Sequence, residues 1–558
     1  MRTRFWSLIL ILILCAGMAY AAKPSSQDSL YEQIRRNIGI FGDVYREISI
    51  RYVDDIDPQK FVRAGIDGML STLDPYTVFI DEEGTEDLDL ITSGRYGGVG
   101  IEIGVRGRDK VLTVISAMDD SPAQRVGIRS GDRIVKIDSL STAGFSTSDA
   151  ARYLRGDPGT QVTLSIERTG SSEPIEFLIT RREIELKDVP YYGFVKPGVG
   201  YVKLAHFSRG APQELDDALT ELKKGGMTSL LLDLRGNPGG LLSSAVAVLQ
   251  RFCPKGDAIL AVKGRHTDND QVFKTQNEPL AGDIPMSVLV DGGSASASEI
   301  VAGAIQDLDR GVLIGETTFG KGLVQSVVSF ETGEALKLTT AKYYTPSGRL
   351  IQKVDYFHDD EGVVRGPSEV RESFSTRNGR PVEGGGGIIP DREIPAPQPG
   401  QLGTELWRQG AFFDFVNEYR ARHPNLTSEH MDDAALGEFR RWLDSTGFHF
   451  GTDGEAELDS LRKLAAQAGV ADTLAADFKH IEEFLDVIRA AQFIKETPFI
   501  RRSLEGELAA NLFGARGRIE SSFATDQVIQ EALRVLENRD EYGKLLTTVK
   551  GTSGNDER

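Results

Sequence analysis

Hydrophobic positions beyond about residue 190 alternate between the spacing of strands and the spacing of helices. Residues 200–204 and 230–234 are short, mostly apolar runs, and the second suits a strand that is buried on both faces of a sheet. Between them, the segment 211–224 places one apolar face at helical spacing: Leu215, Ala218, Leu219 and Leu222. Similar runs follow at 241–252, 287–290 and 335–344. This alternation predicts an α/β core over residues 186–395.

Two regions with different hydrophobic patterns precede that core. Residues 23–92 repeat apolar side chains every three or four positions, which predicts helices. One of these helices runs from Pro58 to Leu73 and ends before Pro75, because the residue before a proline leaves the α region. Residues 93–185 change to glycine-rich turns and short strands, which predict a small β domain.

A proline-rich linker at residues 395–400 separates the core from a C-terminal region with helical periodicity. We interpret residues 396–558 as a helical C-terminal domain that serves self-association or partner docking. A packing extension of the core explains the same pattern equally well, so both interpretations stay open.

The first residues have the pattern of an export signal. Met1-Arg-Thr-Arg4 is basic, residues 5–16 are apolar, and Ala19-Tyr20-Ala21 is a small-x-small cleavage site. We predict a signal peptide at residues 1–22 and a periplasmic or otherwise exported protein, with an uncleaved membrane anchor as the alternative. After cleavage Cys253 is the single cysteine, which excludes an internal disulfide and a cysteine-based metal site.

The composition is that of an ordinary globular protein of several domains, with 558 residues, of which 40% are hydrophobic and 26% charged. The net charge of −19 argues against a nucleic-acid partner, since such a partner favours a basic face.

Candidate chemistry begins at a strand, a Gly-Gly turn and a helix over residues 287–307. The turn carries three serines at positions 294, 296 and 298. A serine on such a turn can lie at a helix N-terminus, where backbone N–H groups and the helix dipole favour a developing oxyanion. Helix capping is the alternative, because serine is a preferred N-cap residue.

Lys321 lies between two glycines and close to Phe319, Leu323 and Val324. Apolar surroundings favour the neutral amine, which can take a proton from a serine hydroxyl. A solvated loop lysine is the commoner interpretation of this segment alone, but its pairing with the serine turn favours catalysis.

The serine turn and the Thr-Phe-Gly-Lys-Gly-Leu-Val-Gln segment at 318–325 together resemble the signature of the carboxy-terminal processing proteases, also called tail-specific proteases, of the S41 peptidase family. The resemblance covers roughly residues 30–395. It implies a Ser/Lys dyad in which the nucleophile is the middle serine and the lysine lies 25 positions further on, which selects Ser296 and Lys321. It also implies supporting roles for three polar residues: Gln325, Glu299 and Asp307.

The loop that follows the apolar run 230–234 also resembles the family. It reads Arg235-Gly-Asn-Pro-Gly-Gly240, and its glycines allow bare N–H groups to approach a ligand. The resemblance implies an oxyanion hole formed by Gly239 or Gly240 together with the N–H of Ala297, the residue after the nucleophile. A plain tight turn is the alternative. The turn at 344–349 resembles the family's substrate-side loop.

Residues 93–185 are similar to a PDZ domain, on the strength of the glycine-rich loop near residue 98 and the Gly-Ile-Arg-Ser-Gly-Asp-Arg-Ile segment at 127–134. In that fold a peptide C-terminus adds a strand, and loop N–H groups hold its carboxylate. The resemblance assigns the carboxylate-binding loop to four residues: Gly98, Val99, Gly100 and Ile101. A β domain with a blocked groove is the alternative.

Together these features predict a multidomain α/β protein: a ClpP/crotonase-like α/β serine protease core with an inserted PDZ-like β domain and helical terminal regions. The expected activity is that of an endopeptidase that cleaves proteins with a free C-terminus, without metal or cofactor. A triad based on His206 or His266 and a non-catalytic peptide-binding scaffold are the rival interpretations. If the C-terminal helices serve docking alone, a chain ending near residue 400 keeps a core that cleaves short peptides.

Overall fold

The computed structural model describes residues 26–107, 109–265, 270–356, 358–359, 362–363, 366–367, 372–451 and 454–547. The predicted signal peptide and His266 lie outside the described residues. The chain divides into two compact units, residues 1–79 and residues 80–558. In the described part of the chain, no helix is long and apolar enough to cross a membrane.

The first unit contains two helices, α2 (Ser26–Arg51) and α3 (Pro58–Leu70). Asp57 caps α3, because its carboxylate accepts hydrogen bonds from the N–H groups of Gln59 and Lys60. The rings of Tyr45 and Phe61 stack between the helices with centroids 5.8 Å apart. The helices predicted for this region are therefore present, although α3 ends three residues before the predicted Leu73. A short strand, β1 (Val78–Ile80), follows.

The second unit begins with helix α4 (Glu82–Ser93) and a β domain. The elements of that domain are β2 (Arg95–Gly98), β3 (Ile101–Arg106), β4 (Val111–Ala117), α5 (Pro122–Val126), β5 (Arg133–Ile137), β6 (Leu140–Ser141), α6 (Thr147–Leu154), β7 (Gln161–Glu167), β8 (Ile175–Thr180) and β9 (Arg182–Glu185). The main sheet has the order β3-β4-β5-β7-β8, and β2 pairs with β9. Because β3 lies at the edge of this sheet, one side of it is open to an added strand.

The α/β core follows. Its elements are β10 (Tyr191–Lys196), β11 (Val199–Lys203), α7 (Ala211–Lys224), β12 (Ser229–Asp233), α8 (Leu242–Leu249), β13 (Ala258–Gly264), β14 (Gln271–Lys274), β15 (Met286–Val290), α9 (Ala297–Asp307), β16 (Val312–Gly315), β17 (Leu323–Ser329), β18 (Ala335–Tyr344) and β25 (Arg392–Glu393). Short pieces between β18 and β25 are β19 (Val354–Asp355), β20 (His358–Asp359), β21 (Gly362–Val363), β22 (Gly366–Pro367), β23 (Ser373–Ser375) and β24 (Pro381–Glu383).

The central sheet has the order β10-β11-β12-β15-β16-β25, and all neighbours except β10 and β11 run parallel. Strands β12 and β15 pair directly. Their carboxyl ends therefore lie side by side, and the loops that leave them meet at one edge of the sheet, where ligands bind in such folds. These loops are the glycine loop at 235–240 and the serine turn at 291–296.

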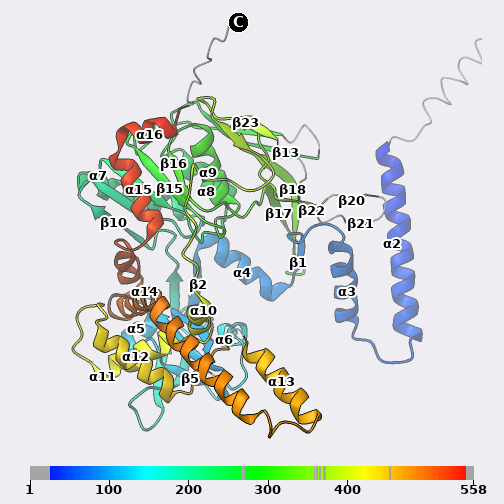
Figure 1. Cartoon of the computed structure of the whole chain (residues 1–558). Helices are drawn as coiled ribbons and strands as arrows, with labels where there is room; N and C mark the ends of the chain where they lie inside the picture. The colour runs from blue at the N-terminus through cyan, green and yellow to red at the C-terminus, as the bar shows by residue number, and fades with distance from the viewer. Residues whose placement is uncertain are drawn as a thin grey trace, which may run out of the picture. The chain divides into compact units, whose positions relative to one another are not determined.

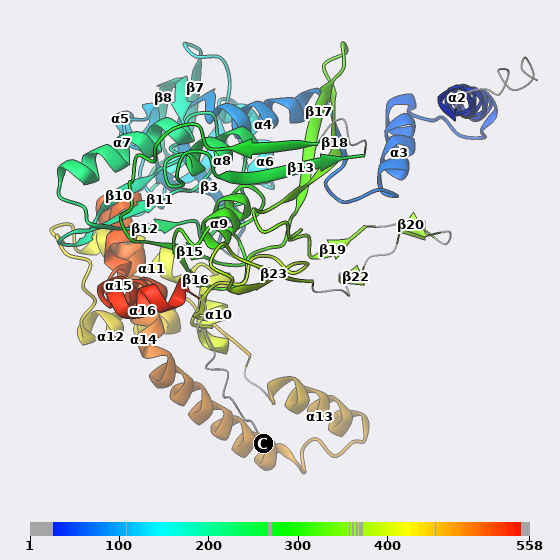
Figure 2. The ribbon, with the colours of Figure 1, turned by 90° about the horizontal axis from the view of Figure 1, so that it is seen from above.

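Both faces of the central sheet are covered by helices. Helices α7, α8 and α9 bury one face, with Leu215, Val248 and Val301 fully buried. The other face packs against two helices from the end of the chain, α15 (Gln527–Glu537) and α16 (Arg539–Leu545), as Figure 1 shows. Figure 2 shows the same pair beside β15 and β16 from a second direction.

The C-terminal helices thus form two groups. Four of them share a separate apolar core: α10 (Gln401–Arg408), α11 (Ala411–Arg422), α12 (Asp433–Ser445) and the second half of α14 (Ala475–Ser522). Helix α13 (Glu455–Gln467) pairs with the first half of α14, for example through the ion pair of Arg462 with Glu482.

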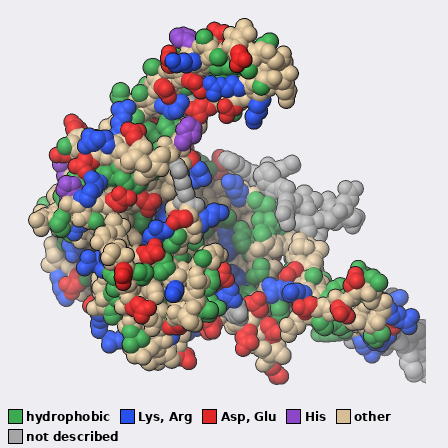
Figure 3. Space-filling model, turned by 90° about the horizontal axis from the view of Figure 1, so that it is seen from below, with side chains coloured by type: hydrophobic (Ala, Val, Ile, Leu, Met, Phe, Trp, Pro, Cys, Tyr) green, Lys and Arg blue, Asp and Glu red, His purple; other side chains and the backbone are tan. Residues whose placement is uncertain are grey.

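Acidic and basic side chains are interspersed on the face that Figure 3 shows.

Helices α15 and α16 favour the interpretation of the C-terminal region as a packing extension of the core. Ile529 and Leu533 lie in one cluster with Leu231, Leu289 and Ile314 of the central sheet. The hydroxyl of Tyr542 lies 3.1 Å from the N–H of Met286 and 3.2 Å from its carbonyl oxygen. These helices thus cover a large part of the second face of the sheet, beside Ile519 and Phe523 from the end of α14.

We expect Ile529→Ala to lower the free energy of unfolding by about 2–5 kcal/mol, because Ile529 is fully buried against the sheet. Gln527→Ala on the same helix changes an exposed side chain and is the matched control. Thermal unfolding of both full-length variants measures the difference. Equal midpoints would show that α15 does not contribute to the core, and a soluble, active chain ending at residue 522 would show the same.

Candidate active site

Ser296 lies at the junction of the serine turn and helix α9. Its backbone has φ 55° and ψ −111°, and residues other than glycine rarely adopt a conformation with positive φ. Ala297 begins the helix and is buried, whereas Ser296 is half-buried. The strained turn therefore holds Ser296 at the N-terminus of α9, beside helical N–H groups that have no partner within the helix.

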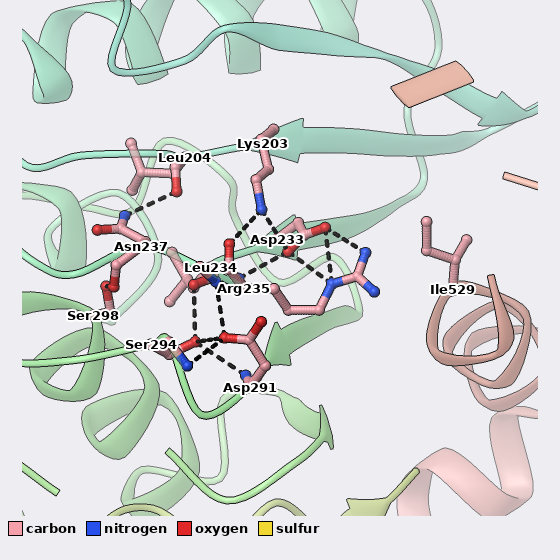
Figure 4. Close-up of polar contacts among 12 residues, drawn as sticks. Lys203, Leu204, Asp233, Leu234, Arg235, Asn237, Asp291, Ser294, Ser298 and Ile529 are labelled. Carbon is pink, nitrogen blue, oxygen red and sulfur yellow. Dashed lines mark hydrogen bonds and ion pairs between the residues drawn. The ribbon is translucent and has the colours of Figure 1, made fainter. Parts of the chain in front are cut away.

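The two flanking serines have structural contacts instead of caps. Ser294 is buried and its hydroxyl donates to the carbonyl oxygen of Leu234 at 2.8 Å, and the buried Ser298 hydroxyl donates to that of Asn237 at 2.9 Å. The Asp291 carboxylate accepts from the N–H groups of Gly236 and Gly293 (Figure 4). The serine turn and the glycine loop are therefore joined by side-chain hydrogen bonds, as their neighbouring strands require.

Glu299 joins the backbone of Ser296 to that of Lys321. Its carboxylate accepts from the N–H groups of Ser296 at 2.8 Å, Lys321 at 2.9 Å and Gly320 at 2.7 Å, and from the Thr318 hydroxyl at 2.6 Å. The side chain is fully buried. Burial raises the pKa of Glu299 to about 7, although the four donors favour the ionised form. Glu299 therefore connects the two segments that carry Ser296 and Lys321, and its supporting role in catalysis stays a prediction.

Tyr343 provides a second connection that the sequence did not reveal. Its hydroxyl lies 2.6 Å from the carbonyl oxygen of Lys321 and 3.1 Å from that of Ser296. Burial, together with the nearby Glu299 carboxylate, raises the pKa of Tyr343 well above its ordinary value, so the hydroxyl keeps its proton and donates. Tyr343 is one residue of an alternating strand, and no local pattern distinguishes it from its neighbours.

The segment around Lys321 is held by β17, β18 and the chain that follows them. Lys321 is half-buried, and the N–H of the next residue, Gly322, donates to the Gln352 side chain at 2.7 Å. Gln325 lies in β17 beside an irregularity in its pairing with β18, and its amide donates to the Thr339 hydroxyl at 3.3 Å. The role of Gln325 in supporting Lys321 stays a prediction.

One N–H group of the glycine loop is placed to bind a ligand, because it has no hydrogen-bond acceptor among the described residues. The N–H of Gly239 donates to the Asn237 side chain at 2.9 Å, so it is already used. Gly240 is held through Phe207, which bonds the carbonyl of Gly239 and the N–H of Leu241. Among the described residues, the N–H groups of Gly240 and Ala297 have no hydrogen-bond acceptor. The geometry therefore favours Gly240 over Gly239 as the partner of Ala297.

Gly239 has a steric role in the same loop. Its φ is 101°, and a Cβ atom there would lie 2.7 Å from the carbonyl oxygen of Ala295 and 2.9 Å from the backbone nitrogen of Ala297. Real side chains do not tolerate such distances to backbone atoms, so a glycine at this position permits the close approach of the loop to the serine turn.

Ion pairs fix the start of the glycine loop (Figure 4). The buried Asp233 accepts hydrogen bonds from Tyr201, Lys203 and Arg235. Burial by itself would raise the pKa of Asp233, but Arg235 and Lys203 outweigh this effect and hold that pKa well below its usual range. On its far side, Arg235 pairs with Asp526 at the start of α15 at 2.7 Å.

Asp307 lies at the opposite end of α9 from Ser296. Its buried carboxylate accepts from the N–H of Ser347 at 3.0 Å and pairs with Arg349 at 2.8 Å. It therefore orders the turn at 344–349, the segment that resembles a substrate-side loop, and its supporting role in catalysis stays a prediction.

The predicted carboxylate-binding loop lies between β2 and β3 of the β domain. Gly98 ends β2 and Ile101 begins β3, while the carbonyls of Val99 and Gly100 accept from Ala123 and Met118. The carbonyls thus point into the domain, at the start of its edge strand β3. Whether the loop N–H groups bind a carboxylate stays a prediction.

The rival histidine triad finds no support in the described residues. His206 is exposed and forms no hydrogen bond with a described residue, so it has no carboxylate to orient its ring. Within the described ranges, no group of three or more His, Cys, Asp or Glu side chains could hold a metal ion.

Four family models match the chain in sequence order. Residues 14–84 match the "Activating protease CtpB N-terminal domain", residues 113–168 a PDZ domain, residues 198–361 "Peptidase family S41", and residues 402–536 "Probable PDZ-protease, C-terminal helical domain". The last three matches fall on the β domain, the α/β core and the C-terminal helices.

Individual relatives agree with these matches. The carboxy-terminal-processing protease of Bartonella bacilliformis is 38% identical over 341 residues, which are 60% of this chain and 76% of that protein. The carboxyl-terminal-processing protease of Synechocystis is 34% identical over 386 residues, or 65% of this chain and 88% of that protein. A solved structure, the photosystem II D1 C-terminal processing protease, is 29% identical over 59% of this chain and 91% of that one, with a TM-score of 0.33.

The predicted combination of an α/β protease core, a PDZ domain and helical terminal regions is thereby confirmed. The chain belongs to peptidase family S41, the serine-type peptidases that include the carboxy-terminal processing proteases.

Proposed function

We propose that this protein is an exported serine endopeptidase that recognises the C-terminus of its protein substrates and cleaves them with a Ser296/Lys321 dyad. The observation that carries the proposal is that two side chains, Glu299 and Tyr343, each contact both residues. Glu299 binds the N–H groups of both, and the Tyr343 hydroxyl lies against the carbonyls of both. Four contacts thus fix the backbones from which the two side chains extend.

The mechanism follows from the chemistry of the two side chains. Lys321 in its neutral form takes the hydroxyl proton of Ser296, and the serine oxygen attacks the peptide carbonyl. Lys321 then donates that proton to the leaving amine as the C–N bond breaks, which leaves an acyl-enzyme on Ser296. A water molecule gives its proton to Lys321 and attacks the ester, which releases the acid and restores the serine.

The oxyanion of each tetrahedral intermediate needs donors on one side of Ser296. We assign this role to the N–H groups of Gly240 and Ala297, which have no acceptor among the described residues. The N-terminal end of α9 adds its dipole at the same place. Gly239 and Asn237 keep the loop in position, as the bond between them indicates.

Substrate choice follows from the PDZ domain and the N-terminal sequence. The loop of Gly98, Val99, Gly100 and Ile101 precedes an edge strand that can pair with an extended peptide, so it suits a free carboxylate. The basic and apolar start of the chain supports export, and therefore exported protein substrates. Exposed apolar side chains on α13 and α14, such as Leu464 and Phe484, support self-association or an adaptor.

Ser296→Ala and Lys321→Ala should each lower peptidase activity by about three orders of magnitude or more, because each removes one half of the dyad. Ser298→Ala is the control: it removes the buried bond to Asn237 and should lower stability by about 1–3 kcal/mol while activity stays measurable. Cleavage of a quenched-fluorescence peptide with a free, apolar C-terminus gives the rates. Full activity of Lys321→Ala would exclude the dyad.

Glu299→Gln should lower kcat by about tenfold to a hundredfold with little change in KM, because the amide nitrogen faces N–H donors and displaces the dyad backbones. The loss should depend on pH. The pKa of Glu299 is raised to about 7, so the wild-type side chain is ionised above pH 7. Below pH 7 one carboxyl oxygen carries a proton and faces the N–H groups as a donor, as the amide nitrogen of the variant does. The ratio of wild-type to variant kcat should therefore be large at pH 8 and shrink toward pH 5.

Stability provides the complementary readout for Glu299. Because the pKa rises from 4.5 in an exposed carboxyl to about 7 in the folded chain, the folded state binds the proton more tightly. The free energy of unfolding of the wild type should fall as the pH rises from about 4.5 to 7, on the order of 3 kcal/mol more than that of Glu299→Gln. Parallel pH profiles of kcat and of stability for the two proteins would contradict the proposed role.

A substrate with an amidated C-terminus should be cleaved with a kcat/KM about tenfold lower than its free-acid form, since hydrogen bonds to a charged group are worth about 1.5–3 kcal/mol. Gly98→Val should reduce the difference by crowding the loop, and its added side chain first meets the movable ring of Tyr96. Gly100→Val is unsuitable, because a Cβ there lies 2.4 Å from Ser121. Equal kcat/KM values for the two substrates would give the PDZ domain a role as spacer alone.

A further inference from the structure

We propose that Asp526, at the start of α15, is a positioning residue for peptide cleavage, because it fixes Arg235 and with it the glycine loop that carries the oxyanion donor. The inference deepens the proposed function and depends on it. It gives the end of the C-terminal region a part in the reaction in addition to its packing against the core.

The two carboxylate oxygens of Asp526 have separate partners. Oδ1 caps α15 by accepting from the N–H groups of Val528 at 2.9 Å and Ile529 at 3.2 Å. Oδ2 accepts from the Arg235 guanidinium at 2.7 Å. The side chains of Asp526 and Arg235 are only 19% and 20% exposed, so water competes weakly for this bond.

Arg235 is held between Asp526 and Asp233. Figure 4 shows its guanidinium extending toward α15, where Ile529 is drawn. Its other nitrogens donate to Asp233 at 2.6–3.1 Å, and its carbonyl oxygen accepts from Lys203 at 2.5 Å. The negative charges of Asp233 and Asp526 therefore offset the positive charges of Arg235 and Lys203. Loss of the Asp526 charge leaves Arg235 and Lys203 with Asp233 alone, and one donor of the guanidinium loses its partner.

The residues that follow Arg235 in the chain contact the serine turn directly. The next residue, Gly236, donates its N–H to Asp291 in the serine turn at 2.8 Å. Asn237 accepts on its carbonyl oxygen from the N–H of Ala295 and the hydroxyl of Ser298, and on its side chain from Gly239. A displacement of Arg235 thus moves the residues that set the distance between Gly240 and Ser296.

Other acids of α15 attach the helix to the core without reaching the loop. Glu537 pairs with Lys196 of β10, and Glu531 pairs with Arg392 of β25. Only the N-cap acid, among the described residues of α15 and α16, contacts the 235–240 loop through an ion pair. This difference separates a role in packing from a role in catalysis and provides a matched control.

The test uses full-length Asp526→Asn, with Glu537→Gln as its control. Asparagine keeps an oxygen for the N-cap, and asparagine and aspartate are about equally good caps, but its amide nitrogen faces Arg235. Asp526→Ser also keeps a capping oxygen and is too short to reach Arg235, so it serves as a second variant if the first folds poorly. Both changes keep α15 capped and remove the ion pair.

With a quenched-fluorescence peptide that has a free, apolar C-terminus, we expect Asp526→Asn to lower kcat about tenfold and to change KM by less than about twofold. A peptide boronic acid, which forms a tetrahedral adduct with the serine, should bind about tenfold more weakly. Glu537→Gln should match the wild type in both measurements. The double variant Arg235→Gln/Asp526→Asn should lose no more activity than Arg235→Gln alone, because Asp526 acts through Arg235.

Equal kcat values for Asp526→Asn and Glu537→Gln would overturn the inference, as would a loss that follows only the unfolded fraction at the assay temperature. Additive losses in the double variant would also overturn it. Ser296→Ala in the same assay tests the proposed function separately. If Ser296→Ala is inactive and Asp526→Asn is fully active, the positioning role fails and the dyad stands, whereas an active Ser296→Ala removes the basis of both.

Discussion

The Glu299 carboxylate lies in the protein interior and accepts hydrogen bonds from three backbone N–H groups and one hydroxyl. Removing a carboxylate from water costs several kcal/mol, and the cost is tolerable only where enough donors surround it. Those donors come from two segments that are distant in sequence, the first residue before α9 and the loop at 318–321. The need to satisfy one buried acidic group therefore fixes the backbones of Ser296 and Lys321 relative to each other, and Tyr343 supports the same arrangement from the carbonyl side.

The remainder of the site depends on the parallel sheet. Strands β12 and β15 end side by side, so the loops after them meet without any long connection. Ser294, Ser298 and Asp291 then join these loops through hydrogen bonds that replace water for their buried backbone groups. The sheet itself requires helices on both faces, and the last helices of the chain pack against one of these faces. The edge of the sheet that carries the serine turn and the last helices of the chain are thus physically connected.

Much of the architecture could be predicted from the sequence, because it depends on local pattern. The alternation of apolar strands and amphipathic helices indicated the α/β core, and glycine-rich segments indicated the PDZ domain and the loop at 235–240. The motif spacing selected Ser296 and Lys321 through the family resemblance, and their catalytic roles stay predictions.

Contacts between distant segments could not be predicted in this way. Nothing in the alternating strand 335–344 distinguishes Tyr343, and the choice between Gly239 and Gly240 depends on an Asn237 side-chain bond that only the folded loop forms. The serines at 294 and 298 looked like helix caps, yet they bond carbonyls of a neighbouring loop. The C-terminal periodicity could not show that α15 and α16 pack on the central sheet while the preceding helices form their own core.

Covalent labelling can establish whether Ser296 is a nucleophile that Lys321 activates. The full-length protein is treated with a fluorophosphonate probe, and the modified residue is located by peptide mass spectrometry. We predict a single adduct on Ser296 that forms at least a hundredfold more slowly in Lys321→Ala, on the order expected when a nucleophile loses its general base. Labelling at another residue would show that Ser296 is not the nucleophile, and an unchanged rate of Ser296 labelling in Lys321→Ala would show that Lys321 does not activate it.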